Sequence, residues 1–172
     1  KLFRLIRISG RRFQIVHVFI GRDTIEVSTF RSGGHVRQNE NGRIMQDNAY
    51  GTVEQDAQRR DFTCNALYYD LARHEILDFC GGVDDVRNKR LRMIGNPAER
   101  YQEDPVRILR TARFAARYGF EVAKETMCLM RQMVEAGEAD ALVAERVWQE
   151  LAKGLMEKQP RRMFEILREC GA

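Results

Sequence analysis

The pattern of apolar and polar positions divides the chain into two regions with different periods. Up to about residue 91, short apolar runs alternate with polar residues and end at turn-forming glycines and asparagines, which is typical of strands. Residues 13–30 are predicted to form a hairpin with its turn at Gly21. The remaining elements predicted in this region are a helix at 52–60, strands at 63–70 and 75–79, and a helix at 83–88. A polar segment at 32–48 is predicted to be a mobile loop.

Beyond residue 91 the apolar residues recur with a helical period. Asn96 and Pro97 are predicted to open a helix that Gly119 ends, because proline suits the first turn and glycine the last. Further helices are predicted at 124–135, 144–157 and 160–169. Their apolar stripes, which include Trp148 and Leu155, are predicted to pack in a core. Together the two regions predict an α+β fold.

The helix expected around EDPVRILRTARF (residues 103–114) carries a cationic stripe. At about 100° per residue, one side holds four arginines: Arg107, Arg110, Arg113 and Arg117. Like charges at this spacing repel one another, so an anion such as a nucleoside triphosphate or an RNA backbone is expected to bind there. The alternative is a solvated face with Glu103 and Asp104 as local counter-ions.

Composition and charge limit the classes of partner. The chain has 172 residues, of which 44% are apolar, and a net charge of +4 that suits a polyanionic partner without requiring one. Four dispersed cysteines form no zinc-ligand spacing and predict reduced thiols in the cytoplasm. No apolar run reaches the roughly 20 residues of a membrane span, so no membrane partner is expected.

A second cluster is formed by the charged residues Arg59, Arg60 and Asp61, followed by Phe62, Thr63 and Asn65. A carboxylate beside two guanidinium groups can bind a metal or accept a proton while the arginines neutralise phosphates. The alternative is an ion-paired helix end, and residue spacing alone leaves both readings open.

Four segments resemble, in order, the motifs of the class II template-independent RNA nucleotidyltransferases, which include bacterial poly(A) polymerases and tRNA CCA-adding enzymes. These segments are RRDFTCNALYYD (59–70), DFCGGVDDV (78–86), EDPVRILRTARFAARYGF (103–120) and ERVWQE (145–150). The resemblance implies a partial nucleotidyltransferase head with a small antiparallel sheet over residues 1–93. An all-helical neck and the start of a body, binding RNA and nucleotide, are implied over residues 94–172.

The resemblance also implies a chemistry, in which an RNA 3′-hydroxyl attacks the α-phosphate of ATP with the help of Mg²⁺. Asp61 matches an active-site carboxylate, and Arg60 a nucleotide-contacting arginine. Asp104 and Arg107 match the pair that reads the edge of the incoming base. Arg110 and Arg113 match triphosphate ligands. A motif that braces the neck is matched by three further residues: Glu145, Arg146 and Glu150.

The family's GGxVRD loop and metal-binding DxD pair do not occur in this sequence, so no metal ligand is assigned and the polypeptide by itself is predicted to be inactive. The preferred function is ATP addition to RNA 3′ ends, because the front of the chain resembles poly(A) polymerases. One alternative is CCA addition to tRNA from CTP and ATP, which the back of the chain resembles. Another, of a different class, is a non-catalytic RNA-binding module. The oligomeric state is left open.

Overall fold

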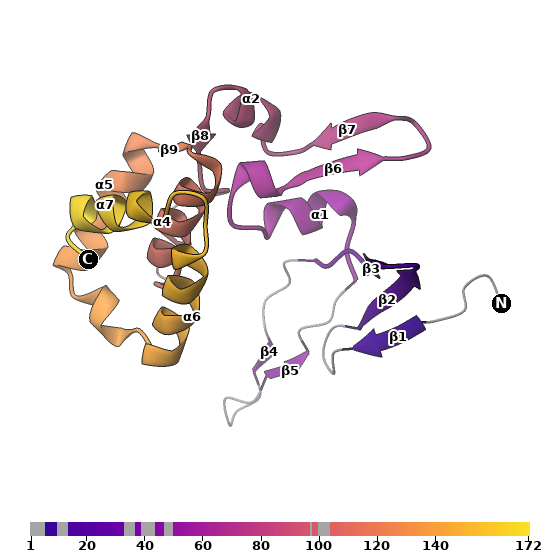
Figure 1. Ribbon diagram of the computed structural model, residues 1–172, viewed down its shortest axis with the longest axis horizontal. Coiled ribbons are helices and arrows are strands. Elements are labelled where there is room, and N and C mark those ends of the chain that lie inside the picture. Colours follow the sequence, from indigo (N-terminus) through magenta and orange to yellow (C-terminus); the bar gives the residue numbers. More distant parts are fainter. Residues whose placement is uncertain are drawn as a thin grey trace. The chain divides into compact units, whose positions relative to one another are not determined.

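The computed structural model describes residues 6–9, 14–32, 37–38, 44–46, 50–96, 98–99 and 104–172. The chain divides into two compact units, Lys1–Arg59 and Arg60–Ala172. This α+β architecture confirms the predicted fold class (Figure 1). The predicted domain boundary between residues 93 and 94 falls inside the second unit and stays a prediction.

A three-stranded antiparallel sheet dominates the first unit. Its strands are β1 (Ile6–Ser9), β2 (Ile15–Ile20) and β3 (Asp23–Val27), in that spatial order. Gly21 adopts a φ of 62° in the two-residue turn between β2 and β3, a conformation that glycine enters without steric cost. The predicted hairpin is therefore confirmed, whereas β1 was not predicted.

The rest of the first unit contains two short strands and one helix. Strands β4 (Arg37–Gln38) and β5 (Ile44–Gln46) pair within the segment predicted to be a mobile loop, most of which lies outside the described residues. Helix α1 (Val53–Gln58) confirms the helix predicted there. It begins with a capping box in which the Thr52 hydroxyl accepts from the Gln55 backbone N–H and the Gln55 side chain accepts from that of Thr52.

The second unit begins with a hairpin and a short helix. After the 3₁₀ helix η1 (Thr63–Asn65), β6 (Leu67–Asp70) pairs antiparallel with β7 (Glu75–Asp78), and α2 (Gly82–Arg87) follows. The strand predicted from residue 63 was wrong for its first residues. The Asp61 carboxylate accepts the Phe62 N–H and the Asn65 side chain, and this local bonding turns the chain before the strand can begin.

Helices make up most of the remainder: α4 (Arg107–Tyr118), α5 (Lys124–Glu135), the 3₁₀ helix η2 (Glu138–Ala141), α6 (Ala144–Leu155) and α7 (Pro160–Cys170). Helix α4 packs against α6 and α7, and α5 packs against α7 (Figure 1). The buried apolar side chains of α4, α5 and α7 join Phe62, Leu91 and Met93 in one core. Two-residue strands β8 (Arg90–Leu91) and β9 (Glu121–Val122) pair in parallel and are too short for periodicity to reveal.

Two predictions about these helices were wrong. The helix predicted to run unbroken from Asn96 and Pro97 to Gly119 is interrupted: residues 98 and 99 are helical, but α4 begins only at Arg107, because Pro105 disfavours helical geometry at Asp104 and a turn precedes α4. Pro97 and residues 100–103 lie outside the described residues. Trp148 and Leu155 are not core residues, since they are 65% and 51% exposed. None of the described helices is long and apolar enough to cross a membrane.

Candidate nucleotide-binding site

Asp61 and Arg110 are 49 positions apart in the sequence and lie in direct contact. One carboxylate oxygen of Asp61 accepts the Phe62 N–H at 2.9 Å and the Asn65 amide at 3.2 Å. The other accepts Arg110 Nε at 3.2 Å and is also contacted by Arg110 Nη2. The structure thus brings together one residue from each of the two predicted charge clusters.

The Arg110 guanidinium lies between two carboxylates and an aromatic ring. Besides Asp61, it faces Glu150 Oε1 of α6 at 3.7 Å from Nη1, and its Cζ lies 5.5 Å from the centre of the Phe114 ring. The side chain of Arg110 is still 32% exposed. A phosphate reaching it from solvent could therefore compete with Asp61 for the same N–H groups.

Arg113 is in a different environment from Arg110. It is only 6% exposed, and its Nε donates to Glu150 Oε2 at 2.7 Å while its Nη1 lies 3.3 Å from Glu157 Oε1. The prediction that all four arginines lie on the unburied side of the helix was wrong for Arg113. The two carboxylates belong to Glu150 on α6 and to Glu157 just after it, and α6 packs against α4. A projection of α4 alone cannot show partners that another helix supplies.

Asp104 pairs with Arg146 of α6, at 3.0 Å from Oδ1 to Nη1 and 2.8 Å from Oδ2 to Nη2. The hydrogen bonds that Arg146 donates to the Asp104 carboxylate raise the pKa of Arg146. Asp104 Oδ1 also accepts the Val106 N–H at 3.3 Å, and the Asp104 carbonyl accepts the Arg107 N–H at 3.0 Å. Arg146 was assigned only a bracing role from the sequence, so its bond to a predicted base-reading residue is new.

Arg60 is held against the hairpin rather than against Asp61. Its Nε donates to the Tyr68 hydroxyl at 2.8 Å, and its Nη1 to the Asn65 carbonyl at 3.2 Å. The Asn65 side chain also accepts from the Tyr118 hydroxyl at 3.2 Å and donates to Asp61. Asn65, which follows the second cluster in the sequence, therefore connects both predicted site residues to α4.

Asp85 is a residue that the sequence did not single out for the site. It is fully buried and accepts from Thr63 Oγ1 at 2.7 Å, Arg90 Nε at 2.7 Å and Arg92 Nε at 2.8 Å. Burial alone would raise the pKa of Asp85, but these hydrogen bonds outweigh it and hold the pKa below its usual range. Asp85 joins η1, α2 and β8 and so supports the segment that carries Asp61.

No group of three or more His, Cys, Asp and Glu side chains that could hold a metal occurs among the residues that the structure describes.

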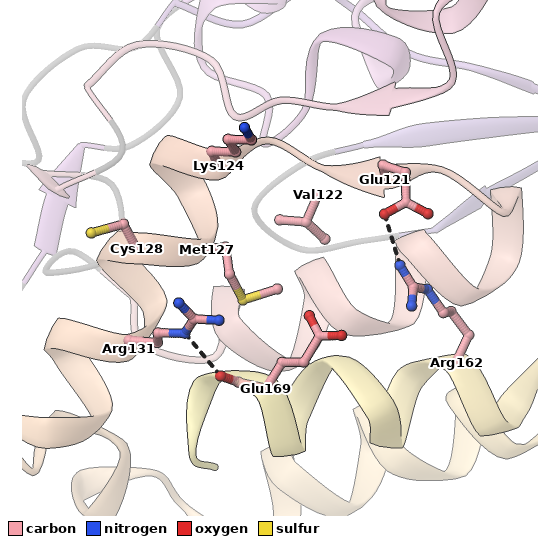
Figure 2. Close-up of a pocket in the computed structure, with 8 residues that line it drawn as sticks. All are labelled: Glu121, Val122, Lys124, Met127, Cys128, Arg131, Arg162 and Glu169. Atoms are coloured by element: carbon pink, nitrogen blue, oxygen red, sulfur yellow. Dashed lines mark hydrogen bonds and ion pairs between the residues drawn. The ribbon is translucent and has the colours of Figure 1, made fainter.

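A hollow of about 320 Å³ lies within the second unit, apart from the predicted site residues (Figure 2). In it Arg162 pairs with Glu121 at 2.9 Å, and Arg131 Nε donates to the Glu169 carbonyl at 2.9 Å. Its lining residues are Glu121, Val122, Lys124, Met127, Cys128, Arg131, Arg162 and Glu169.

The α+β fold and the order of the charged motifs place the chain in the family of template-independent RNA nucleotidyltransferases. Residues 1–92 match the family described as "Poly A polymerase head domain", and residues 119–172 match the family described as "Probable RNA and SrmB- binding site of polymerase A". The chain belongs to the poly(A) polymerase head domain family.

Curated relatives come from both branches of this class. The chain is 67% identical over 121 residues to the "Multifunctional CCA protein" of Neisseria gonorrhoeae, covering 70% of this chain and 28% of that protein. It is 48% identical over 136 residues to "Poly(A) polymerase I" of Escherichia coli, covering 73% of this chain and 29% of that protein. The chain thus spans less than a third of the length of these relatives.

Solved structures of the class have the same fold. The Bacillus stearothermophilus CCA-adding enzyme in complex with CTP matches with a TM-score of 0.79 and 28% identity, over 97% of this chain and 39% of that one. A tRNA nucleotidyltransferase complexed with a primer tRNA and an incoming ATP analog matches with a TM-score of 0.76 and 29% identity, over 96% and 45% of the two chains.

Proposed function

We propose that this chain is the nucleotide-binding part of an enzyme that adds nucleotides from ATP to RNA 3′ ends without a template. The observation that carries the proposal is the contact between Asp61 and Arg110. Two motifs far apart in sequence meet there, and the partly exposed guanidinium matches the geometry of phosphate oxygens.

Each charged residue then has a proposed role. Asp61 acts at the reacting centre once a triphosphate has drawn Arg110 away from it. Asp104 and Arg107 read the base edge, where a carboxylate supplies acceptors and a guanidinium supplies donors. Triphosphate binding is assigned to Arg60, Arg110 and Arg113, of which Arg113 must first leave its carboxylate partners.

The proposed cofactors are ATP and Mg²⁺, which the triphosphate itself coordinates. RNA 3′ ends are the proposed second substrate, and the cytoplasm the proposed location. Because no metal cluster occurs among the described residues, none of them is assigned as a Mg²⁺ ligand.

CCA addition to tRNA from CTP and ATP is a second candidate, supported by the 67% identity to the Neisseria gonorrhoeae protein. Comparing the affinities for ATP and CTP discriminates the two: a clear preference for ATP favours poly(A) synthesis, and comparable affinities favour CCA addition. A non-catalytic RNA-binding module is supported by the match of residues 119–172. It predicts salt-sensitive RNA binding and no nucleotide affinity.

Calorimetry at low salt tests the main proposal. Arg110→Ala should weaken ATP and CTP binding about tenfold or more, since a charged hydrogen-bonding partner of phosphate is lost. Arg161→Ala is the control, because Arg161 lies on α7 outside the cationic stripe and its side chain is exposed, and it should change affinity less than about twofold. Equal effects of the two substitutions would contradict the proposed triphosphate site.

A further inference from the structure

Tyr68 of strand β6 makes two kinds of contact with the guanidinium group of Arg60. The Tyr68 hydroxyl accepts from Arg60 Nε at 2.8 Å. The centre of the Tyr68 ring lies 5.1 Å from Arg60 Cζ, within the range of cation–π attraction. With Nη1 donating to the Asn65 carbonyl at 3.2 Å, the guanidinium is restrained at two of its three nitrogens.

The pleat of β6 gives this contact to Tyr68 and not to its neighbour Tyr69. Successive side chains of a strand point to opposite faces, so the two tyrosines lie on different sides of the hairpin. Tyr69 is 55% exposed, and its hydroxyl lies 3.3 Å from His74 Nδ1. The same side chain therefore occurs twice on one strand, with Arg60 as a partner at only one of the two positions.

The contact between Arg60 and Tyr68 lies outside the apolar core of the second unit. Arg60 is exposed and Tyr68 is half-buried, and neither belongs to the core around Phe62 and Leu91. Polar contacts at such a surface contribute little to stability. They do restrict a long side chain that would otherwise sample many rotamers.

A restrained guanidinium is what a phosphate group requires. Guanidinium N–H groups bind phosphate oxygens in pairs when the plane of the group faces them. A side chain that is ordered before the ligand arrives also loses less conformational freedom on binding. Arg60 is well placed for this role, because Asn65 accepts from it and also donates to Asp61, which contacts Arg110.

We infer that Tyr68 is a positioning residue that orders Arg60 for the phosphate groups of the nucleotide. This inference rests on the proposed function, in which Arg60 binds the triphosphate. Tyr68 acts through Arg60 and need not touch the nucleotide. Losing the Tyr68 hydroxyl should therefore weaken all nucleoside triphosphates by the same factor, whatever their base.

Calorimetry of the 172-residue chain at low salt with ATP and CTP tests the inference. Tyr68→Phe should weaken both about fivefold, because one hydrogen bond to Arg60 is lost while the ring is kept. The urea midpoint of unfolding should stay unchanged. Tyr69→Phe is the matched control, since it removes the same hydroxyl from the same strand, and it should change either affinity less than about twofold.

A double-mutant cycle with Arg60→Ala shows whether Tyr68 acts through Arg60. Once Arg60 has been truncated, Tyr68→Phe should have no further effect on ATP affinity, because the side chain that it orders is gone. An equal loss with and without Arg60 would overturn the inference, since Tyr68 would then affect the nucleotide by another route.

The outcomes also separate this inference from the proposed function. If Tyr68→Phe leaves ATP affinity unchanged, or if Tyr69→Phe weakens it equally, while Arg110→Ala still weakens it, the inference is overturned and the proposed function stands. If the unsubstituted chain binds no nucleotide, both are overturned. A loss of affinity together with a lowered urea midpoint counts against positioning, because it indicates that the hairpin itself is disturbed.

Discussion

The two units of the chain differ most in what they bury. In residues 60–172, a core of apolar side chains is almost fully removed from solvent, with Phe62, Ile108 and Ile166 at or below 1% exposure. Among the described residues of the first 59, only Val18 and Ala57 are buried apolar residues. The strand register puts Ile6, Val18 and Ile25 on one face of the sheet, and Ile6 and Ile25 are 54% and 49% exposed.

This difference shows that strands can form their backbone hydrogen bonds without burying an apolar core. The ladder of β1, β2 and β3 satisfies backbone groups, but each such bond adds only about 1 kcal/mol net, and most hydrophobic stabilisation comes from buried area. The second unit is expected to supply most of the chain's folding stability. The apolar sheet face is suited to burial against another apolar surface.

The largest expected contrast comes from equal truncations in the two units. Ile166→Ala should lower the free energy of unfolding by about 2–5 kcal/mol, because a fully buried side chain leaves a cavity. Ile25→Ala should change it by less than about 0.5 kcal/mol. Urea unfolding followed by circular dichroism measures both. A cost above about 1 kcal/mol for Ile25→Ala would show that its face is covered in solution.

The buried ion pair of Arg113 and Glu150 should give the next largest effect on stability. Arg113→Met should cost about 3 kcal/mol, since it leaves a buried carboxylate without its nearest partner. Adding Glu150→Met should restore part of that loss, because a pair of apolar side chains needs no charge compensation. Urea unfolding of the single and double variants tests this cycle. If the double variant is no more stable than Arg113→Met alone, the two side chains do not act as a pair.

Asp85 should make the stability of the second unit depend on pH. Its folded-state pKa lies below the unfolded value of about 3.9, so its contribution is present above that value and is lost as the pH falls through the folded pKa. Asp85→Asn should therefore cost about 2 kcal/mol at pH 7 and less near pH 3, below the unfolded-state pKa. Thermal melts at the two pH values measure the difference. A constant cost would indicate that shape rather than charge matters at this position.

Cysteine reactivity gives the smallest effect, because it reports on single side chains. Burial, and then the nearby charge of Asp61, raises the pKa of the Cys64 thiol to about 11, and burial raises the pKa of the Cys170 thiol. Exposed Cys128 should be alkylated first near neutral pH, with Cys64 and Cys170 far slower. Mass spectrometry after timed alkylation gives the order. Early labelling of Cys64 would mean that the surroundings of Asp61 open readily.

The sequence predicted elements whose signals are local. The hairpin at Gly21 and the helix beginning at Pro160 follow from turn and proline rules, and the helix after Thr52 follows from its local pattern. It did not predict the burial of Arg113 or the parallel pairing of Arg90–Leu91 with Glu121–Val122. Those features depend on partners about 30 to 40 residues away, and periodicity within one element does not encode a distant partner.

For the candidate site as well, the sequence identified individual residues but not the contacts between them. The sequence identified Asp61 and Arg110 separately, and only the tertiary fold brings them into contact. It also paired Asp104 with Arg107, as neighbours on a helix, whereas the Asp104 carboxylate forms its ion pair with Arg146 of α6. The proposed roles of these residues in nucleotide binding stay predictions.

The side-chain N–H signals of the arginines test the central claim most directly. Arg110 Nε donates to Asp61, and Arg131 Nε donates to the Glu169 carbonyl, so both should give protected signals in a ¹H–¹⁵N spectrum. If Arg110 binds the triphosphate, adding ATP should shift the Arg110 signal and leave that of Arg131 in place. An Arg110 signal that stays unchanged at saturating ATP would contradict the account.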